Sequence, residues 1–258
     1  MTDDNPRQLS LFASPYLRFI VTLLVVLGCL LLNPTHSAQA TSSLTTVYEQ
    51  RTIHSSNGIG KYYMGREIAQ VMGHTGAGWL ERPSREAEEQ PSKIVSVLNL
   101  KPDDVVADIG AGTGYLSFRV APLLTKGKVL AVDIQPEMLE IIEFFKQEKH
   151  ISNVEPILAS MTNPNLPDAS VDLAVMVDAY HELEYPQEVM QGIVKALKPG
   201  GKVVLVEYRG ENPFIMIKRL HKMTQKQVRQ EMQAVGLVWR ETKNLLPQQH
   251  LMVFEKQV

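Results

Sequence analysis

The sequence predicts an α/β fold: a Rossmann-like, seven-stranded, mostly parallel sheet with helices on both faces and a C-terminal antiparallel hairpin. Two observations support this prediction. From residue 104 to 236, short apolar segments alternate with amphipathic ones, and strands linked by helical crossovers form a parallel sheet. The last two strand-like segments are joined only by a short Pro-Gln-Gln loop. This loop is too short for a crossover, so one of the two strands must run antiparallel.

Each strand and helix has a local signal. Strands are predicted where β-branched, apolar runs end in turn residues, and helices where apolar residues recur at helical spacing. Ser92 and Thr224 are N-cap candidates, Pro136 fits a first helical turn, and Pro199-Gly200-Gly201 is expected to end a helix. The predicted strands are 104–110, 127–134, 154–159, 170–179, 202–208, 237–246 and 250–256. The predicted helices are 92–100, 115–124, 136–149, 186–197 and 224–236.

Two regions precede the sheet-forming domain, which we place at residues 92–258. Residues 1–40 contain an uncharged run, 19–32, followed by Ala38-Gln39-Ala40, which matches the small-x-small pattern of a signal-peptidase site. This region is therefore expected to be a signal peptide or an N-terminal membrane segment. The protein is then either exported, to the periplasm or the extracellular space, after cleavage near Ala40, or associated with the membrane through the run 19–32.

Residues 41–91 are predicted to form a linker followed by a helical cap. The stretch 62–72 places Tyr63, Ile68 and Met72 at roughly helical spacing. Aromatic and cationic side chains of this region are candidates to close over a bound ligand and select its partner, although they equally suit a purely anchoring role. They are Tyr62, Tyr63, Arg66, His74, Trp79 and Arg82.

The overall charge and the single cysteine narrow the function classes. The 258 residues have a formal net charge of −2, so no basic field attracts nucleic acid, and we expect no nucleic-acid partner. Cys29 is the only cysteine and precedes the expected cleavage site. The cleaved protein therefore has neither a disulfide nor a thiolate nucleophile. The sequence makes no prediction of the oligomeric state.

The segment VADIGAGTG, residues 106–114, places a glycine-rich turn directly after a predicted strand. Glycines in such a turn let the backbone approach a ligand closely. Their positions at 110, 112 and 114 differ from the G-x-G-x-x-G pattern of dinucleotide folds, which requires glycine where Tyr115 stands. The spacing therefore disfavours an NAD(P)-dependent oxidoreductase, which we keep as an alternative.

Two carboxylates indicate which cofactor this turn holds. Asp108 lies at the end of the same strand, where it would repel a pyrophosphate and attract an ammonium group. Asp133 ends the next strand, where a carboxylate accepts hydrogen bonds from both ribose hydroxyls of an adenosine. S-adenosylmethionine meets both requirements, because it has free ribose hydroxyls and a cationic amino-acid portion.

Four motifs in sequence order resemble the class I S-adenosylmethionine-dependent methyltransferases of type 11. They are VADIGAGTG, AVDIQPEML, SVDLAVMVDAYHEL and LKPGGKVVLVEY, and the resemblance covers about residues 92–256. It implies transfer of a methyl group from S-adenosylmethionine to an unidentified small-molecule acceptor, with a non-catalytic module that only binds the cofactor as the alternative. It also implies cofactor contacts by Gly110, Ala111, Gly112, Gly114, Asp133 and Ile134, and it places Asp178 beside the methyl group.

The chain departs from this family at the end of the third predicted strand. Many relatives have Gly-Asp there, and the aspartate binds the adenine amino group, whereas this chain has Ala159-Ser160. A neutral hydroxyl is a weaker acceptor than a carboxylate. We therefore assign adenine recognition to Ser160 and Met161, through their side chains or backbone groups.

The stretch after the fourth predicted strand carries the candidate catalytic residues Tyr180, His181 and Glu182. His181 suits a general base because imidazole titrates near neutral pH. A histidine here is nevertheless widespread among relatives with dissimilar acceptors, which favours a structural hydrogen bond instead. Asp178, His181 and Glu182 lie close together in the sequence and lack a distant partner ligand, so we expect no metal. His221 and Lys222, in a later loop, are further candidates for acceptor contacts.

Overall fold

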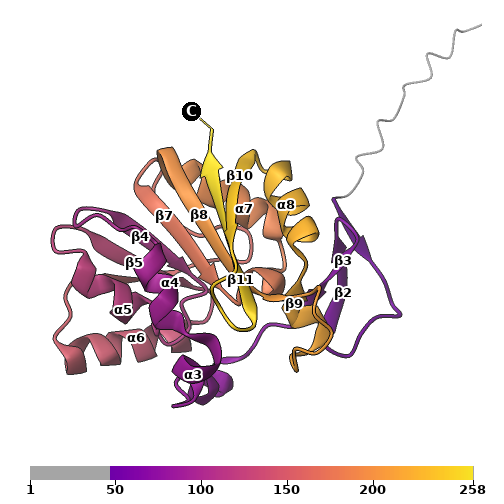
Figure 1. Cartoon of the computed structure of the whole chain (residues 1–258), viewed down its shortest axis with the longest axis horizontal. Coiled ribbons are helices and arrows are strands. Elements are labelled where there is room, and N and C mark those ends of the chain that lie inside the picture. Colours follow the sequence, from indigo (N-terminus) through magenta and orange to yellow (C-terminus); the bar gives the residue numbers. More distant parts are fainter. Residues whose placement is uncertain (1–46, 258) are drawn as a thin grey trace, which may run out of the picture. The chain divides into compact units, whose positions relative to one another are not determined.

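A computed structural model describes residues 47–257, and their central feature is a sheet with the strand order β10-β11-β8-β7-β4-β5-β6, to which β9 adds beside β8 (Figure 1). β11 runs antiparallel to both β8 and β10, while the other neighbours are parallel. The predicted parallel sheet and its C-terminal hairpin are thus confirmed. The strands are β4 (Val105–Ile109), β5 (Lys128–Asp133), β6 (Val154–Leu158), β7 (Val171–Val177), β8 (Leu197–Arg209), β9 (Lys222–Met223), β10 (Leu237–Lys243) and β11 (Gln249–Lys256).

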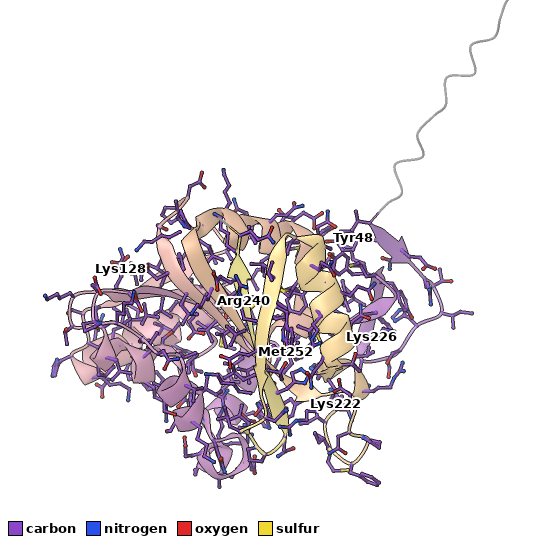
Figure 2. The ribbon with its side chains drawn as sticks, turned by 45° about the horizontal axis from the view of Figure 1, so that its top comes forward. Tyr48, Lys128, Lys222, Lys226, Arg240 and Met252 are labelled. Carbon is purple, nitrogen blue, oxygen red and sulfur yellow. The ribbon has the colours of Figure 1, made fainter. Side chains whose placement is uncertain are left out.

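Helices cover both faces of the sheet because its strands are apolar on both sides. Alternate residues of β4 belong to different cores: Ala107 packs with α7 and α8, whereas Val106 packs with α4, α5 and α6. In Figure 2, Met252 of β11 lies among these packed elements while Lys128 and Arg240 reach the surface. The helices are α4 (Pro91–Val97), α5 (Ser117–Val120), α6 (Pro136–Lys149), α7 (Pro186–Ala196) and α8 (Gln225–Ala234).

Four local predictions can be compared with the helix ends. Pro136 lies in the first turn of α6 as predicted, whereas the predicted N-cap Ser92 is wrong, because α4 begins at Pro91 and its N-cap is Gln90. The Thr224 hydroxyl accepts a hydrogen bond from the Gln227 N–H at 3.2 Å, so the predicted N-cap of α8 is confirmed. The predicted end of the preceding helix, at residue 197, is confirmed to within one residue, but Pro199-Gly200-Gly201 does not form a turn after it. α7 already ends at Ala196, and these three residues form the first part of β8.

The helix predicted within residues 62–72 is wrong. This stretch belongs to a small antiparallel sheet of β1 (Tyr48–Gln50), β2 (Gly58–Tyr63) and β3 (Arg66–Ala69). Tyr63 pairs with Arg66 across a two-residue loop in which Met64 and Gly65 both have positive φ. A two-residue loop of this conformation fits the twist of a β-hairpin. Within residues 47–90, helical segments occur only after this small sheet, as the short 3-10 turn η1 (His74–Gly76), α2 (Ala77–Leu80) and α3 (Arg85–Glu89).

A buried ion pair fastens this hairpin to the main domain. The Arg66 guanidinium donates to both carboxylate oxygens of Glu231 on α8, at 2.9 and 3.0 Å. It also donates to the backbone carbonyl of His181 at 3.0 Å, and the Tyr180 hydroxyl donates to Glu231 at 2.7 Å. Arg66 thus ties β3 to α8 and to the segment that follows β7.

The predicted signal or membrane segment, residues 1–40, lies outside the described residues. Within residues 47–257, no helix has the length and the apolar character needed to cross a membrane.

Candidate functional site

A cavity of about 610 Å³ opens at the carboxyl ends of β4, β5 and β7. In an open parallel sheet, ligands bind at this edge, beside the point where the strand order reverses. Here the reversal lies between the neighbouring strands β4 and β7, because the chain runs from β4 to β5 and β6 on one side and from β7 to β8 on the other. Residues of the sheet domain and residues of the cap both line the cavity. The same cavity therefore contains residues predicted to bind the cofactor and residues predicted to contact the acceptor.

Most of the predicted cofactor residues line this cavity. Those that do are Gly110, Gly112, Asp133, Ile134, Ser160, Met161 and Asp178. Asp108, Ala111 and Gly114 do not contribute to its lining. The Asp108 carboxylate instead accepts a hydrogen bond from the Ser117 hydroxyl at 2.6 Å, and burial raises its pKa to about 6. Asp108 therefore lies outside the cavity wall, and its contact with an ammonium group stays a prediction.

The glycine turn is held in a conformation that other residues rarely adopt. Gly110 and Gly112 have φ of +68° and +55°. A Cβ on Gly110 would lie 2.7 Å from the Ala179 Cβ, and a Cβ on Gly112 would lie 2.7 Å from Cδ1 of Leu80 in the cap. Both distances are below van der Waals contact, so side chains at these positions would push the cap and the end of β7 away from the cavity.

Asp133 connects this turn to the next strand. Its Oδ2 accepts the Gly112 N–H at 2.8 Å, and its Oδ1 accepts the Gln135 N–H at 2.9 Å. Burial raises the pKa of Asp133, and these backbone donors oppose that rise. Each carboxylate oxygen has two lone pairs, so both retain capacity for the hydroxyls of a ribose.

The residues predicted near the adenine are apolar or neutral, unlike the carboxylate of Asp133. Ile134 and Met161 line the cavity, and these two residues are 40% and 54% exposed. Exposed apolar groups on a cavity wall are suited to cover the face of an aromatic ring. The Ser160 hydroxyl accepts the Asn163 N–H at 3.1 Å, which fixes the loop that carries both Ser160 and Met161.

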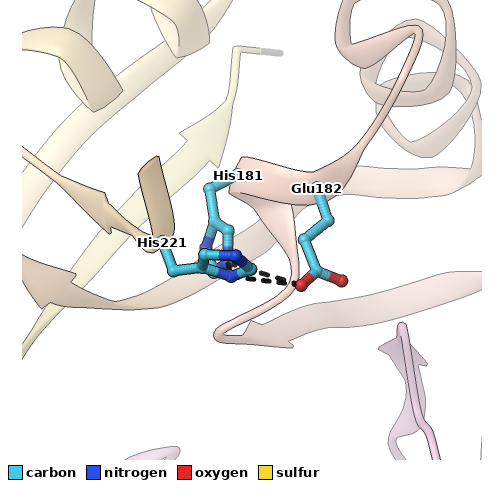
Figure 3. A group of neighbouring side chains, drawn as sticks. All are labelled: His181, Glu182 and His221. Carbon is cyan, nitrogen blue, oxygen red and sulfur yellow. Dashed lines mark hydrogen bonds and ion pairs between the residues drawn. The ribbon is translucent and has the colours of Figure 1, made fainter. Parts of the chain in front are cut away.

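Only two of the three predicted catalytic residues line the cavity. All three form the 3-10 turn η3 (Tyr180–Glu182), but Tyr180 is fully buried and outside the cavity lining. His181 and Glu182 line the cavity and meet His221, from the turn η4 (Arg219–His221) (Figure 3). His181 Nε2 lies 3.0 Å from His221 Nδ1, which in turn lies 3.3 Å from Glu182 Oε1.

A buried carboxylate sets the orientation of His181. Its Nδ1 lies 2.6 Å from Oε2 of Glu207, a residue of β8 with no exposed surface. Burial acts to lower the pKa of His181, but the carboxylates of Glu207 and Glu182 oppose it and the pKa is raised overall. The structural hydrogen bond expected for this histidine is present, and its second nitrogen still faces the cavity cluster.

The electrostatic character of the cavity is acidic. Asp178 is partly buried, and Gln249 donates to one of its oxygens at 2.6 Å, while the other oxygen has no hydrogen-bond partner among residues 47–257. Burial raises its pKa strongly, and the negative charges of Glu207 and Glu89 add to that rise. Formal charges on the lining residues comprise four carboxylates and two cations, namely Asp133, Asp178, Glu182 and Glu184 against Arg85 and Lys218. Such a surface favours a cationic ligand over a pyrophosphate.

The cap contributes a segment that sequence reasoning missed. Among the six predicted cap residues, Trp79 alone contributes to the cavity lining, together with unpredicted neighbours at 69–72. The Met72 N–H donates to Glu182 Oε2 at 3.2 Å, and the Gln135 side chain donates to the Met72 carbonyl at 3.0 Å. Residues 69–72 therefore bridge the ends of β7 and β5 across the cavity. No local pattern in the sequence signals this long-range pairing.

Of the two acceptor contacts predicted in the later loop, His221 and Lys222, only one lines the cavity. His221 lines the cavity, whereas the Lys222 ammonium donates to the carbonyls of Asn212 and Ile215, at 3.3 and 3.2 Å. Lys222 thus closes the loop on itself. Lys218, which sequence reasoning did not select, is the lysine of this loop that lines the cavity.

Comparisons with known proteins agree with this geometry. The family model described as "Methyltransferase domain" matches residues 100–256. An uncharacterized methyltransferase-like protein of Schizosaccharomyces pombe is 31% identical over 119 residues, which are 46% of this chain and 44% of that protein. A demethylmenaquinone methyltransferase of Tropheryma whipplei is 31% identical over 121 residues, 46% of this chain and 48% of that protein. The chain thus spans about half the length of these curated relatives.

A solved structure shares the fold over most of the chain. The crystal structure of a SAM-dependent methyltransferase from Aquifex aeolicus superposes with a TM-score of 0.68 at 22% identity, covering 72% of this chain and 99% of that one. At this level of identity the likeness concerns the fold alone.

Proposed function

This chain belongs to the methyltransferase-domain family, and from this premise we propose that it transfers a methyl group from S-adenosylmethionine to a small-molecule acceptor. The observation that carries the proposal is the acidic cavity at the carboxyl edge of the sheet, with the glycine turn and Asp133 on one side and the His181 cluster on the other. Asp133 has lone pairs for ribose hydroxyls, and Ile134 and Met161 supply the apolar cover for an adenine.

The protein's own contribution to the reaction is positioning and charge. S-adenosylmethionine supplies an electrophilic methyl group on a cationic sulfur. The unpartnered oxygen of Asp178 and the carboxylates around it balance a cation at the end of β7. Alignment of two reactants contributes much of the acceleration of such a displacement. His181, Glu182 and His221 lie where an acceptor would lose its proton.

The cavity supports a small acceptor with an apolar part. Its volume lies within the range of roughly 300–1,000 Å³ usual for ligand pockets, and it has to hold cofactor and acceptor together. Leu183, Val189 and Ile217 line it beyond the cluster, and Ile59 contributes from the cap. The curated relatives do not narrow the acceptor further, since their names include a demethylmenaquinone and a phosphoethanolamine methyltransferase.

A binding comparison on the full chain tests the cofactor assignment. S-adenosylhomocysteine is expected to raise the melting temperature, and NAD to leave it unchanged. Asp133→Asn removes the charged acceptor, which is worth about 1.5–3 kcal/mol, so calorimetry should show roughly 10- to 150-fold weaker binding of S-adenosylhomocysteine. The matched control is Asp168→Asn, because Asp168 is an exposed carboxylate paired with Lys195. Stabilisation by NAD alone would contradict the proposal.

Transfer itself is tested with labelled cofactor. The protein is incubated with methyl-labelled S-adenosylmethionine and a metabolite extract, and labelled small molecules are separated from labelled protein. Label in a small molecule, lost in the Asp133→Asn variant, is the expected result. Firm cofactor binding with no label transferred to any component would favour the non-catalytic module.

We also propose that residues 1–40 direct the chain to or across a membrane, on the sequence pattern alone. Determining the first residue of the protein isolated from its natural source tests this: Thr41 is expected after cleavage. A first residue of Met1 or Thr2 in a soluble protein would contradict export. If the protein is exported, its compartment must contain a supply of S-adenosylmethionine.

A further inference from the structure

The cluster of His181, Glu182 and His221 has the composition of a transition-metal site. Two imidazoles and one carboxylate on adjoining turns form the ligand set found in many iron(II) and zinc centres. The three ligating atoms are His181 Nε2, His221 Nδ1 and Glu182 Oε1, and they lie within 4.8 Å of one another (Figure 3). The sequence-based expectation of no metal rested on the lack of a distant ligand. The fold supplies that ligand, because His221 comes from η4, after β8.

The distances between these atoms match the first coordination sphere of a small cation. The separations are 3.0 Å between the two imidazole nitrogens, 3.3 Å from His221 to Glu182, and 3.8 Å from His181 to Glu182. The point equidistant from these three atoms is about 2.0 Å from each, and zinc binds histidine nitrogen at about 2.0–2.1 Å. A divalent ion therefore fits without a large movement of the side chains.

Surrounding hydrogen bonds orient two of the three ligands, His181 and Glu182. A carboxylate can only accept, so Glu207 fixes the proton of His181 on Nδ1 and leaves a lone pair on Nε2. Metal-bound histidines commonly have such a carboxylate partner on the other nitrogen. Glu182 is held in the same way, because its Oε2 accepts the Met72 N–H and its Oε1 is left toward the two histidines.

From this arrangement we propose that His181, Glu182 and His221 bind one divalent first-row transition-metal ion at the acceptor end of the cavity. All three side chains line the cavity, so the remaining coordination positions face the acceptor. A bound cation lowers the pKa of a coordinated hydroxyl, and the site therefore selects acceptors that present an oxygen donor. This last point rests on the proposed methyl transfer, whereas the metal site does not.

Direct metal binding tests the proposal without any activity measurement. The full chain, without an affinity tag, is stripped with a chelator and titrated with Co²⁺, followed by visible absorption, and with Zn²⁺, followed by calorimetry. One ion per chain is expected. His221→Gln and Glu182→Gln should each weaken binding at least tenfold, and Glu207→Gln should weaken it about 10- to 100-fold by releasing His181.

The control is His74→Gln, because His74 faces Glu137 on the surface and lies outside the cavity lining. It should bind the ion like the parent. His221 is partly exposed, and retained binding of S-adenosylhomocysteine shows that the His221→Gln variant is folded. Absence of a 1:1 complex, or a complex unaffected by His221→Gln, overturns the metal site. If the protein binds the cofactor but no metal, the proposed methyl transfer stands and the metal site is overturned. If it binds the metal but no cofactor, the metal site stands and the proposed methyl transfer is overturned.

Discussion

Replacing Asp108 by asparagine is expected to stabilise the protein at neutral pH and to leave it unchanged in acid. The Asp108 side chain is 4% exposed and lies behind the glycine turn. Burial raises its pKa from 3.8 to about 6, although the Ser117 hydroxyl and backbone N–H oppose that rise. Ionised Asp108 is therefore less well accommodated in the folded protein than in the unfolded chain.

The sign and size of the effect follow from these two pKa values. Between pH 3.8 and about 6, the folded state holds a proton that the unfolded state has released, so stability falls as the pH rises through this window. Below pH 3.8 both states are protonated and the penalty is absent. Above about pH 6 both are ionised and the penalty is complete, at about 3 kcal/mol. A neutral asparagine side chain at this position carries no such penalty at any pH, so the difference between variant and parent should grow across that window.

Urea unfolding of the full chain at several pH values measures this difference. The free energy of unfolding of Asp108→Asn, minus that of the parent, should increase by about 3 kcal/mol from about pH 4 to pH 7. Asp168→Asn, at an exposed surface pair, should show a flat difference and serves as the control. Ser117→Ala should enlarge the parent's pH dependence, because it removes the donor that stabilises the carboxylate. Parallel curves for the parent and Asp108→Asn would refute the reasoning.

Two further substitutions test how the cap and the glycine turn are held. Arg66→Ala leaves Glu231 as a buried carboxylate without its cation. This should lower the free energy of unfolding, measured with urea, by about 3–5 kcal/mol. A loss below about 1 kcal/mol, the size expected for a surface ion pair, would mean that this ion pair does not anchor the hairpin. Gly112→Ala places a Cβ 2.7 Å from Leu80 at a positive φ, so it should weaken binding of S-adenosylhomocysteine in calorimetry. The double variant with Leu80→Ala should recover part of that loss, and no recovery would point to backbone strain alone.

Seven strands of the main sheet were predictable because each has a local signal, whereas the two-residue β9 has none and was not predicted. β5 and β7 contain the apolar runs 129–132 and 173–177, which end just before Asp133 and Asp178. The helix between these strands has a different period of apolar residues. Parallel connection then follows from the alternation itself. The cavity was predictable for the same reason, since the carboxyl ends of parallel strands meet at one edge of the sheet.

The cap was mispredicted because two periodicities compete over a short stretch. Ile68, Val71 and Met72 fit a helix when they are counted by spacing, but the two-residue loop at Met64-Gly65 makes Ile68 part of a hairpin strand. The glycine at position 65 was the available signal, since a glycine in a two-residue loop between β-prone segments indicates a hairpin. The His181–His221 contact had no such signal. Its partners are 40 positions apart in the chain, and tertiary packing alone brings them together.

The cap and the chemistry of the cavity are mechanically connected. The Arg66 guanidinium holds the carbonyl of His181, and the Met72 N–H holds the carboxylate of Glu182. The hairpin and residues 69–72 thus fix two neighbouring residues of the cluster from outside the family match, which begins only at residue 100. Loss of either hydrogen bond is therefore expected to disturb the positions of His181 and Glu182, although Arg66 and Met72 both lie outside the region that the family model matches.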